Sequence, residues 1–445
     1  MSVFKAYDIR GIYGSQIDAA LAEKIGRAYT AEVKPRSVVI GHDMRPCAPE
    51  IAQALARGLT SAGVEVVGIG LCSTPVLSFA LGRGGFDGGI MVTASHNPAE
   101  YIGMKLARKG AVPIGRDTGI AAMEARIRAG QLPPDAARKG HVREASYTDE
   151  YVDMVARHAK FGRRLKVVVD AGNGMGGWEF PLVARRLDLE VVPLYFELDG
   201  TFPNHEANPL DHKTLAELEK RVVKEKADLG IAFDGDADRA GFVDEKGGII
   251  TNDLATALMA ADILSREKGP VVYDLRSSRA LPEEITRHGG TPVRGRVGHS
   301  FMKNAMREHG CVFGGEYSGH YYFRENYNTE SSSLAVIAMC NIVSRAKAGV
   351  SGLLQPLRRY LQTGEVNFRV EDKEAKMKEI EAAFPDAEID WLDGVTVQYA
   401  DWWCNVRPSN TEPLLRLNLE ANSKAVFEKQ KKRVFAILGT PVGGH

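Results

Sequence analysis

The chain has 445 residues, more than one hydrophobic core usually serves, and this length indicates about three domains. A composition of 44% hydrophobic and 26% charged residues is typical of a globular protein. Lysine plus arginine and aspartate plus glutamate each total 57, so the formal net charge is zero. This balance argues against a broad surface for nucleic acids or anionic membranes.

The cysteines and the N-terminus indicate where the protein works. The five cysteines are scattered without a Cys-x-x-Cys pair, so we expect free thiols and neither a disulfide framework nor a zinc site. The first ten residues carry no apolar signal-peptide region, and the longest apolar run, 334–340, is too short to cross a bilayer. We therefore expect a cytoplasmic protein that binds neither nucleic acid nor membrane.

Helical and strand patterns alternate along most of the chain, which predicts parallel or mixed sheets covered by helices on both faces. In the first unit, apolar spacing predicts helices over 19–33, 49–62 and 75–81 and strands over 37–41, 64–69, 88–92 and 104–106. Apolar strands that end in polar loops recur near residues 38, 167 and 271. This recurrence favours three related α/β domains in tandem, although any strand of an α/β sheet has a similar appearance.

The last segment differs, because its strand patterns cluster around only two predicted helices, over 373–383 and 423–438. That arrangement predicts a small α+β domain with helices on one side of a sheet. The predicted fold class is α/β, with three tandem doubly wound mixed-sheet domains and a C-terminal α+β domain around a central cleft. Polar and Gly/Pro-rich seams predict the domain ranges 1–145, 146–248, 249–362 and 363–445.

The stretch 93–98, Thr-Ala-Ser-His-Asn-Pro, directly follows the predicted buried strand 88–92. Open α/β sheets bind their ligands at the carboxyl ends of such strands. The small neighbour Ala94 leaves the hydroxyl of Ser95 accessible, and Asn97-Pro98 ends the strand in a turn. We interpret Ser95 as a serine that can carry phosphate, with an ordinary surface loop as the alternative.

Three carboxylates, Asp234, Asp236 and Asp238, alternate in the loop after the apolar strand 229–233. A curved loop turns all three toward one hard divalent cation and leaves a position for a phosphate oxygen, which Mg²⁺ favours. A calcium-binding EF-hand is an alternative, because Glu245 stands at the twelfth position of such a loop. Its sixth position requires glycine, however, where this chain has Arg239, and the flanks are predicted strands rather than helices.

Two later loops carry groups suited to a phosphorylated sugar. Glu316, Ser318 and His320 alternate after the strand 311–313, so in an extended chain they would share one side and suit sugar hydroxyls. The stretch 407–413 joins two strands and offers a guanidinium, two hydroxyls, an amide and backbone N–H groups to a phosphate dianion. For either loop alone, an ordinary polar hairpin or turn is an equal alternative.

Two further clusters carry charged or aromatic groups. Residues 7–11, Tyr-Asp-Ile-Arg-Gly, lie near the N-terminus, where a buried salt bridge is the alternative to a binding role. Residues 296–300 predict the start of a helix whose N-terminus would hold an anion, although a capped structural helix would have the same pattern.

The loops 93–98, 234–239, 315–320 and 407–413 resemble the four signature loops of the α-D-phosphohexomutases, in the family's order and one per domain. The resemblance covers essentially the whole chain. Residues 5–11 and Asn410 resemble the phosphomannomutase/phosphoglucomutase branch; phosphoglucosamine mutases, the alternative, typically have Gly at the position of Asn410 and Gln at that of Tyr317. Three positions depart from common family patterns. This chain has Tyr317 where the branch often has Met, Ile102 where many members have Asn, and Arg276 where some relatives have Lys. Tyr317 leaves the sugar preference open.

The resemblance implies reversible phosphoryl transfer between hexose 1-phosphate and hexose 6-phosphate, of mannose, glucose or both, with a hexose 1,6-bisphosphate as intermediate and activator. It implies a phosphorylated Ser95 and Mg²⁺ held by Ser95, Asp234, Asp236 and Asp238. The other catalytic residues that it implies are Arg10, Lys105, Arg239, His299 and His320, with Lys105 or His320 as the general base. The substrate-binding residues that it implies are Tyr7, Arg276, Glu316, Ser318, His320, Arg407, Ser409, Asn410 and Thr411.

Two rival functions share some of these features. A serine-nucleophile phosphatase would hydrolyse the same phosphosugars, but it would not need a second phosphate site and a sugar loop in separate domains. A non-catalytic phosphosugar-binding protein would not need Ser95, Lys105 and the three metal carboxylates together. We expect phosphosugars as partners, a monomer or weak dimer, and closure over the substrate by movement of the last domain about the seam near Gly364.

Overall fold

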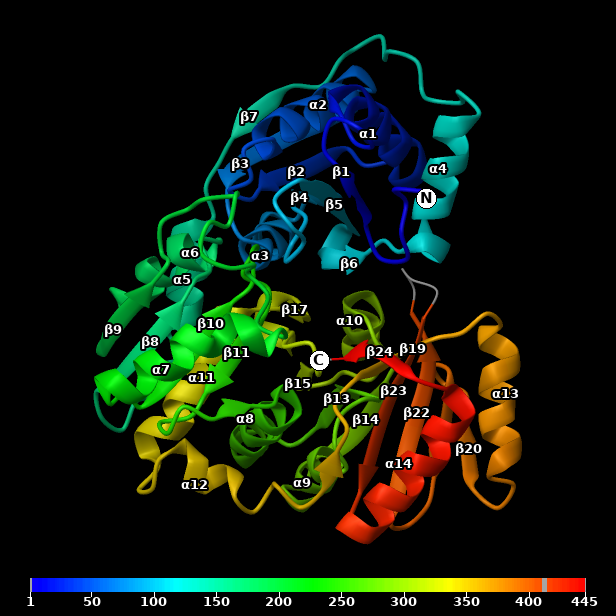
Figure 1. Cartoon of the computed structure of the whole chain (residues 1–445). Coiled ribbons are helices and arrows are strands. Elements are labelled where there is room, and N and C mark those ends of the chain that lie inside the picture. The colour runs from blue at the N-terminus through cyan, green and yellow to red at the C-terminus, as the bar shows by residue number, and fades with distance from the viewer. Residues whose placement is uncertain (1, 410–413, 445) are drawn as a thin grey trace.

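The computed structural model describes residues 2–409 and 414–444. Four sheets follow one another along the chain and lie around a common centre, from the N-terminal sheet in blue to the C-terminal one in orange and red (Figure 1). Among the described residues, no helix combines the length and apolar character needed to cross a bilayer. Short 3₁₀ helices lie at Lys109–Ala111, Arg116–Thr118, His212–Leu215 and Arg324–Asn326.

The first sheet has seven strands in the order β1-β5-β4-β2-β3-β7, with β6 paired to β5. Its strands are β1 (Ile9–Ile12), β2 (Ser37–His42), β3 (Glu65–Leu71), β4 (Gly88–Val92), β5 (Tyr101–Arg108), β6 (Val112–Pro113) and β7 (Val142–Glu144). Its helices are α1 (Ala19–Val33), α2 (Ala48–Ser61), α3 (Thr74–Gly84) and α4 (Ile120–Arg128). Helix α3 begins earlier than predicted because the Ser73 side chain caps it, accepting a hydrogen bond from Val76 N.

The second and third sheets have five strands each, in the orders β12-β11-β10-β8-β9 and β14-β13-β15-β16-β17. The second unit contains α5 (Thr148–Ala156), β8 (Leu165–Asp170), α6 (Gly176–Ala184), β9 (Leu189–Leu194), α7 (Ala216–Glu225), β10 (Leu229–Phe233), β11 (Ala240–Val243) and β12 (Ile249–Ile250). The third contains α8 (Asn252–Arg266), β13 (Pro270–Asp274), α9 (Ala280–Arg287), β14 (Thr291–Gly295), α10 (His299–Glu308), β15 (Phe313–Gly315), β16 (Tyr321–Phe323), β17 (Thr329–Glu330), α11 (Ser332–Arg345) and α12 (Val350–Leu354).

The fourth sheet is antiparallel throughout and runs β20-β21-β22-β23-β19-β24, with β18 paired to β23. Its strands are β18 (Leu361–Gln362), β19 (Val366–Arg369), β20 (Glu388–Asp390), β21 (Val395–Gln398), β22 (Trp402–Pro408), β23 (Leu414–Ala421) and β24 (Pro441–Gly444). Helices α13 (Lys373–Ala383) and α14 (Lys424–Leu438) match the predicted pair closely and lie beside the sheet (Figure 1). The expected α+β tail is therefore confirmed.

The first three sheets share one topology. The orders β5-β4-β2-β3, β11-β10-β8-β9 and β16-β15-β13-β14 are equivalent, each with one antiparallel pair followed by parallel neighbours. The three strands that prompted the tandem interpretation are β2, β8 and β13, which occupy the same place in each sheet. The loop that closes each antiparallel pair carries Ser95, the three aspartates or Glu316. Equivalent topology therefore presents the first three signature loops from equivalent positions.

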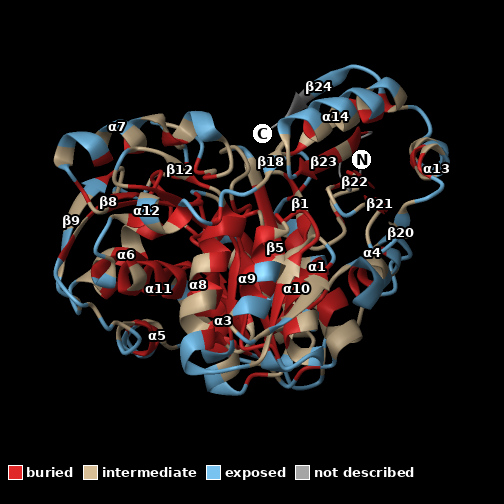
Figure 2. Cartoon of the chain, turned by 90° about the horizontal axis from the view of Figure 1, so that it is seen from below, coloured by how far each residue is buried: buried red, intermediate tan, exposed pale blue. Residues whose placement is uncertain are grey.

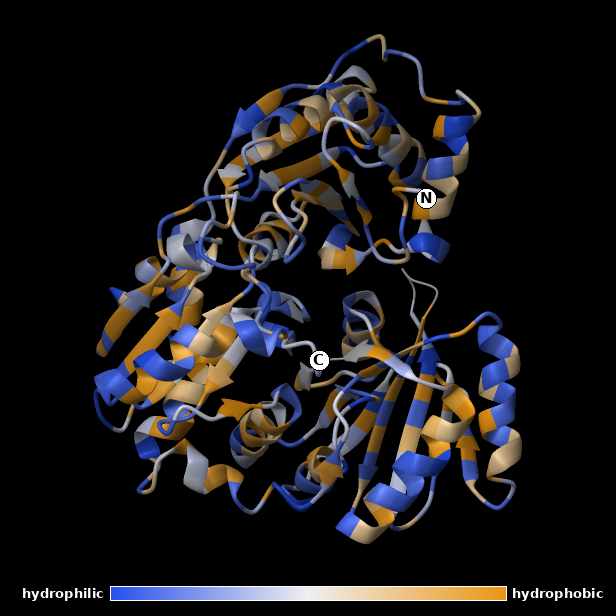
Figure 3. Cartoon of the chain, in the orientation of Figure 1, coloured by the Kyte–Doolittle hydropathy of each residue, from blue (hydrophilic) through white to orange (hydrophobic). Residues whose placement is uncertain are grey.

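The hydrophobic cores divide the molecule unevenly. One continuous cluster of buried apolar side chains crosses all of the first three domains and includes Val39, Val169 and Val336, whereas the fourth domain has a separate core around Phe368. Buried residues fill the interior of the sheets (Figure 2), and their strands are largely hydrophobic (Figure 3). The separate core leaves the fourth domain joined to the rest mainly through polar contacts, which favours independent movement.

Candidate active site

Ser95 lies three residues beyond the end of β4 and has a left-handed backbone conformation, with φ +51°. Only 2% of Ser95 is exposed to solvent. A non-glycine residue adopts this conformation at an energetic cost, which the surrounding contacts must offset. The Thr93 hydroxyl accepts a hydrogen bond from Ser95 N at 2.9 Å. The Ser95 hydroxyl donates to Asp234 Oδ2 at 2.8 Å. The predicted phosphate-carrying serine and the first predicted metal ligand are therefore in direct contact.

Arg45 holds the Ser95 loop and was missed by sequence reasoning. Its fully buried guanidinium donates to the carbonyl oxygens of Ser95 (3.0 Å), Asn97 (2.6 Å), Pro98 (2.8 Å) and Tyr101 (3.0 Å). A single planar side chain thereby fixes the loop's path from β4 into β5. The available signal was position alone, since Arg45 follows the strand β2 much as Ser95 follows β4.

The three aspartates form a compact cluster, with one carboxylate oxygen of each within 4.8 Å of the others. All are at most 1% exposed. Asp236 Oδ1 is buried without a hydrogen-bond partner among the described residues. Burial, together with the charges of Asp238 and Asp236, raises the pKa of Asp234 well above its ordinary value. Buried carboxylate oxygens at this spacing fit a hard divalent cation.

The flanks of the aspartate loop exclude an EF-hand. Strands β10 and β11 enclose it, where an EF-hand has helices. Glu245, the residue at the twelfth position, instead accepts a hydrogen bond from Ser351 N at 3.0 Å. The calcium-loop alternative is therefore rejected.

Lys105 reaches the aspartate cluster from β5. Its Nζ lies 2.6 Å from Asp236 Oδ2 and 2.5 Å from Asp238 Oδ2. Burial alone would lower the pKa of Lys105, but the charges of Asp236 and Asp238 outweigh it and raise the pKa. From the start of α3, the Thr74 hydroxyl also donates to Asp236 Oδ2, at 2.5 Å. The first domain thus supplies both a cation and a hydroxyl to the carboxylates of the second.

The loop of Glu316, Ser318 and His320 is a turn, not the extended segment that alternation suggested. Gly319 has φ +83°, and its N–H donates to Glu316 O at 3.0 Å. The three side chains still converge, because His320 Nδ1 lies 2.8 Å from Ser318 Oγ and 3.2 Å from Glu316 Oε2. The turn, rather than strand alternation, brings the predicted sugar-binding groups together.

His320 also joins the sugar loop to the aspartates. Its Nε2 lies 3.3 Å from Asp238 Oδ1, and Arg239 Nε lies 3.3 Å from the same nitrogen. Burial opposes a charged imidazole, but the Asp238 carboxylate outweighs that effect and raises the pKa of His320 to about 9. Arg239 also approaches Asp234, at 3.8 Å.

The N-terminal cluster and the start of α10 meet beside these groups. Arg10 pairs with Asp8 at 2.5 Å, the salt bridge that stood as the alternative to a binding role, and also donates to Asn97 Oδ1 in the Ser95 loop at 2.6 Å. The rings of Tyr7 and His299 lie edge to face with centroids 5.8 Å apart. At the N-terminal end of α10 a protein carboxylate is already present, since Gly298 N donates to Glu316 Oε1 at 2.9 Å.

The fourth loop is described only in part. Asn410 and Thr411, two of the predicted phosphate-binding residues, lie outside the described residues. Arg407 ends near Glu365 Oε2, with which it forms a buried ion pair, and Ser409 N donates to Leu414 O at 2.8 Å across the two strands. Arg276 Nη1 approaches the same Glu365 oxygen at 3.7 Å.

Models of the phosphoglucomutase/phosphomannomutase family match four consecutive parts of the chain: α/β/α domain I over residues 1–133, domain II over 147–248, domain III over 251–360 and the C-terminal domain over 365–437. The chain belongs to the phosphoglucomutase/phosphomannomutase family. The family prediction and the predicted α/β fold class are confirmed.

Individual family members resemble the chain along its whole length. A phosphomannomutase of Salmonella montevideo is 37% identical, with 99% of each chain covered. A Xanthomonas campestris protein named among the phosphohexose mutases is 38% identical over 96% of each chain. The solved structure of a phosphoglucomutase/phosphomannomutase family protein from Burkholderia thailandensis superposes with a TM-score of 0.90 at 35% identity, covering 98% of this chain and 97% of that one.

In this phosphoglucomutase/phosphomannomutase family member, six of the predicted residues outside the aspartate cluster fall into two groups. Ser95, Lys105, Arg239 and His320 each contact one or more of the three aspartates. Arg276 and Arg407 instead meet on Glu365, a residue that sequence reasoning did not single out. The first group combines a nucleophile, acidic ligands and cations, whereas the second gathers guanidinium groups suited to a phosphate.

Proposed function

We propose that this protein reversibly converts hexose 1-phosphate into hexose 6-phosphate, with mannose, glucose or both as the sugar. The reaction passes through phosphoserine at Ser95 and a hexose 1,6-bisphosphate. One observation carries the proposal: Ser95 Oγ lies 2.8 Å from a carboxylate of a buried three-aspartate cluster in a member of this family. A serine beside such a cluster suits phosphoryl transfer, which depends on positioning and charge neutralisation.

In the first half-reaction, a free sugar hydroxyl bonds to the phosphorus of phosphoserine while the bond from phosphorus to Ser95 Oγ breaks. The hydroxyl proton passes to a general base, and Ser95 Oγ takes up a proton as it leaves. Lys105 and His320 are the two candidates for the base, and either must first lose a proton, because the aspartates raise the pKa of both. The resulting bisphosphate turns over in the site. Ser95 Oγ then loses its proton and bonds to the phosphorus of the other phosphoryl group while the bond from that phosphorus to the sugar oxygen breaks, and the freed sugar oxygen takes up a proton. Both half-reactions use one serine, because the turned intermediate presents its second phosphate where the first one stood.

Asp234, Asp236 and Asp238, with an oxygen of phosphoserine, would hold the cation, which we propose to be Mg²⁺. When bound, that ion would neutralise charge on the transferred group. We assign Arg10 and Arg239 to hold phosphoserine, since each reaches the Ser95 loop or its Asp234 partner. Their fixed guanidinium groups supply donors that do not lose their charge during the reaction.

The remaining roles concern the substrate. Glu316, Ser318 and His320 would bind sugar hydroxyls common to both orientations. Tyr7 and His299 would line the site. Arg276 would belong to the phosphate-binding group around Arg407. We assign the second phosphate to Arg407, Ser409, Asn410 and Thr411. We further propose that the protein is a cytoplasmic monomer or weak dimer.

The test compares the intact masses of the wild-type protein and a Ser95→Ala variant, followed by assays on glucose 1-phosphate, mannose 1-phosphate and glucosamine 1-phosphate. We expect an excess of about 80 Da in the wild type only, and formation of the 6-phosphate stimulated by a trace of bisphosphate. Release of inorganic phosphate without isomerisation would indicate a phosphatase instead. Full activity of Ser95→Ala would overturn the proposal.

A further inference from the structure

Glu365 stands where the third domain passes into the fourth. It lies between Gly364, which has φ +65°, and the start of β19, and it is only 6% exposed. A buried carboxylate needs compensating partners, because burial penalises its charge. Its place at the junction means that those partners can come from both domains.

Three guanidinium groups surround this carboxylate. Arg407 Nη2 contacts Oε2, Arg416 Nη1 lies 3.1 Å from Oε1, and Arg276 Nη1 lies 3.7 Å from Oε2. Burial would raise the pKa of Glu365, yet these arginines lower it, so the group is ionised. Arg276 is also paired with Asp274, at 2.6 Å, so the three guanidinium groups face at least two carboxylates. Arg407 Nε, moreover, is buried without a hydrogen-bond partner among the described residues.

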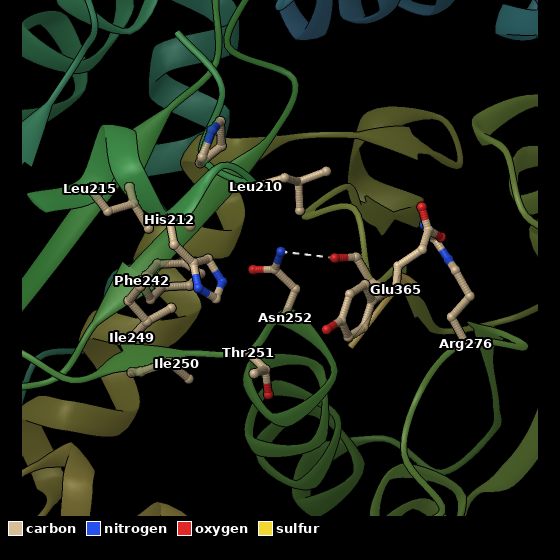
Figure 4. A pocket seen from close by; sticks show the side chains of 13 residues that line it. Leu210, His212, Leu215, Phe242, Ile249, Ile250, Thr251, Asn252, Arg276 and Glu365 are labelled. Atoms are coloured by element: carbon tan, nitrogen blue, oxygen red, sulfur yellow. Dashed lines mark hydrogen bonds and ion pairs between the residues drawn. The ribbon is translucent and has the colours of Figure 1, made fainter. Parts of the chain in front are cut away.

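A chain of polar contacts connects this cluster with the sugar loop. Tyr317 N donates to Asp274 Oδ2 at 2.8 Å, and the same oxygen lies 2.6 Å from Arg276 Nη2. Arg276 in turn reaches Glu365, and Glu365 reaches Arg407. Figure 4 shows Glu365 and Arg276 together at one end of a pocket whose middle holds Asn252, bonded to the carbonyl oxygen of Tyr317 at 3.0 Å.

We propose that Glu365 is a positioning residue: it holds Arg407 in the orientation that receives the substrate's phosphate and ties that orientation, through Arg276, to the sugar loop. This inference rests on the proposed function. Arg407 donates to Glu365 through Nη2, and this buried, charge-assisted contact restricts where the guanidinium can lie. A restricted position is needed because the two orientations of the bisphosphate must each find a phosphate site of the same geometry.

Two variants separate positioning from simple charge balance. Glu365→Gln removes the charge, and Glu365→Asp keeps it but withdraws the carboxylate from Arg407. Positioning predicts that both raise the KM for glucose 1-phosphate about tenfold or more. Charge balance alone predicts a lower KM for Glu365→Gln, whose site becomes more positive, and no change for Glu365→Asp. Either of those results would overturn the inference.

Glu420→Gln is the matched control. Glu420 is a buried carboxylate at the same junction, where it accepts from Arg279 N at 3.0 Å and Trp403 Nε1 at 2.8 Å but does not share the arginine cluster. We expect its KM to stay within about twofold of wild type. A KM shift equal to that of Glu365→Gln would mean that loosening the junction, not the position of Arg407, causes the effect, and would overturn the inference.

A double-mutant cycle with Arg407→Lys separates positioning from a merely structural role, because it measures whether the effect of Glu365→Gln on KM depends on Arg407. If Glu365 acts through Arg407, Glu365→Gln should change KM less than about twofold in that background. If Glu365→Gln raises KM by the same factor in the Arg407→Lys background as in the wild type, the inference is overturned. A different result would contradict the proposed function itself, namely wild-type protein that makes no hexose 6-phosphate. An active wild type whose KM is unchanged by Glu365→Gln would contradict the positioning role alone.

Discussion

Ser95 and Asp234 lie in loops that follow strands of two different sheets, β4 and β10, and Ser95 Oγ lies 2.8 Å from Asp234 Oδ2. This contact depends on the residue next to Asp234. A Cβ on Gly235 would lie 2.4 Å from the carbonyl oxygen of Ser95, closer than any side chain can approach that backbone. The serine loop and the aspartate loop can therefore touch only because position 235 is glycine.

Gly235→Ala should separate the two loops and lower kcat by about 100-fold, since a displacement of about 1 Å at reacting groups has that effect. Gly68→Ala in β3 is the control, because the nearest atom to its Cβ would be 4.0 Å away. Steady-state kinetics on glucose 1-phosphate and thermal unfolding of both variants provide the measurement. Wild-type kcat in Gly235→Ala would show that the close approach is unimportant for turnover.

Asp236→Asn should weaken the binding of Mg²⁺. We expect the Mg²⁺ concentration for half-maximal activity to rise at least about tenfold, because one anionic ligand is lost from three. A second readout is the stabilisation of the protein against heat by added Mg²⁺, which follows from binding to the folded state alone. Asp188→Asn, at an exposed surface ion pair, is the control and should behave as wild type. Equal stabilisation of Asp236→Asn and wild type by Mg²⁺ would place the ion elsewhere.

Arg45→Lys should damage the Ser95 loop although the charge is kept. Lysine cannot reproduce a planar group that donates to four carbonyl oxygens, so at least one charge-assisted hydrogen bond, about 1.5–3 kcal/mol, is lost. We expect kcat/KM to fall between about 10- and 150-fold, with less phosphate on Ser95 by intact mass. Arg57→Lys, in an exposed pair with Glu23, is the control. If kcat/KM and the phosphate content of Ser95 are the same in Arg45→Lys as in the wild type, the loop keeps its path without the planar guanidinium.

Much of the fold could be predicted because its signals are local. Helix α1 has the predicted bounds, since an apolar face lies between an Asp18 cap and a left-handed Lys34. Strand β5 was predicted at only 104–106, because its first half pairs with β1, far away in the sequence. Periodicity along one segment carries no information about such a partner.

The same limit applies to the site. Ser95 and the aspartates were found because loop chemistry after an apolar strand is a local pattern. Arg45 and Glu365 were missed because each is defined by groups that lie more than forty residues away and meet it only in the folded chain. The turn at residues 316–320 stood only as an alternative to an extended segment, because alternation of polar residues does not reveal the positive φ of Gly319.

Protonation of His205 should stabilise the folded protein at mildly acidic pH. Its Nε2 lies 3.1 Å from Asp170 Oδ2, beside the Tyr195 ring. Burial disfavours the charged imidazole, but the hydrogen bond to Asp170 and the charge of that carboxylate outweigh it, so the folded-state pKa of His205 is raised. A raised folded pKa means that the contribution is complete below the unfolded value of about 6.5 and is lost as pH rises through the folded value.

His205→Gln should therefore lower the free energy of unfolding more at a pH of about 5.5 than at about 8.5. Urea unfolding of wild type and variant at both pH values gives the comparison. His141→Gln is the control, because His141 is exposed, lies 3.5 Å from Glu65 and gains little from that partner. A His205→Gln deficit that is equal at both pH values, or larger at the higher one, would show that the imidazole contributes by packing rather than as a cation.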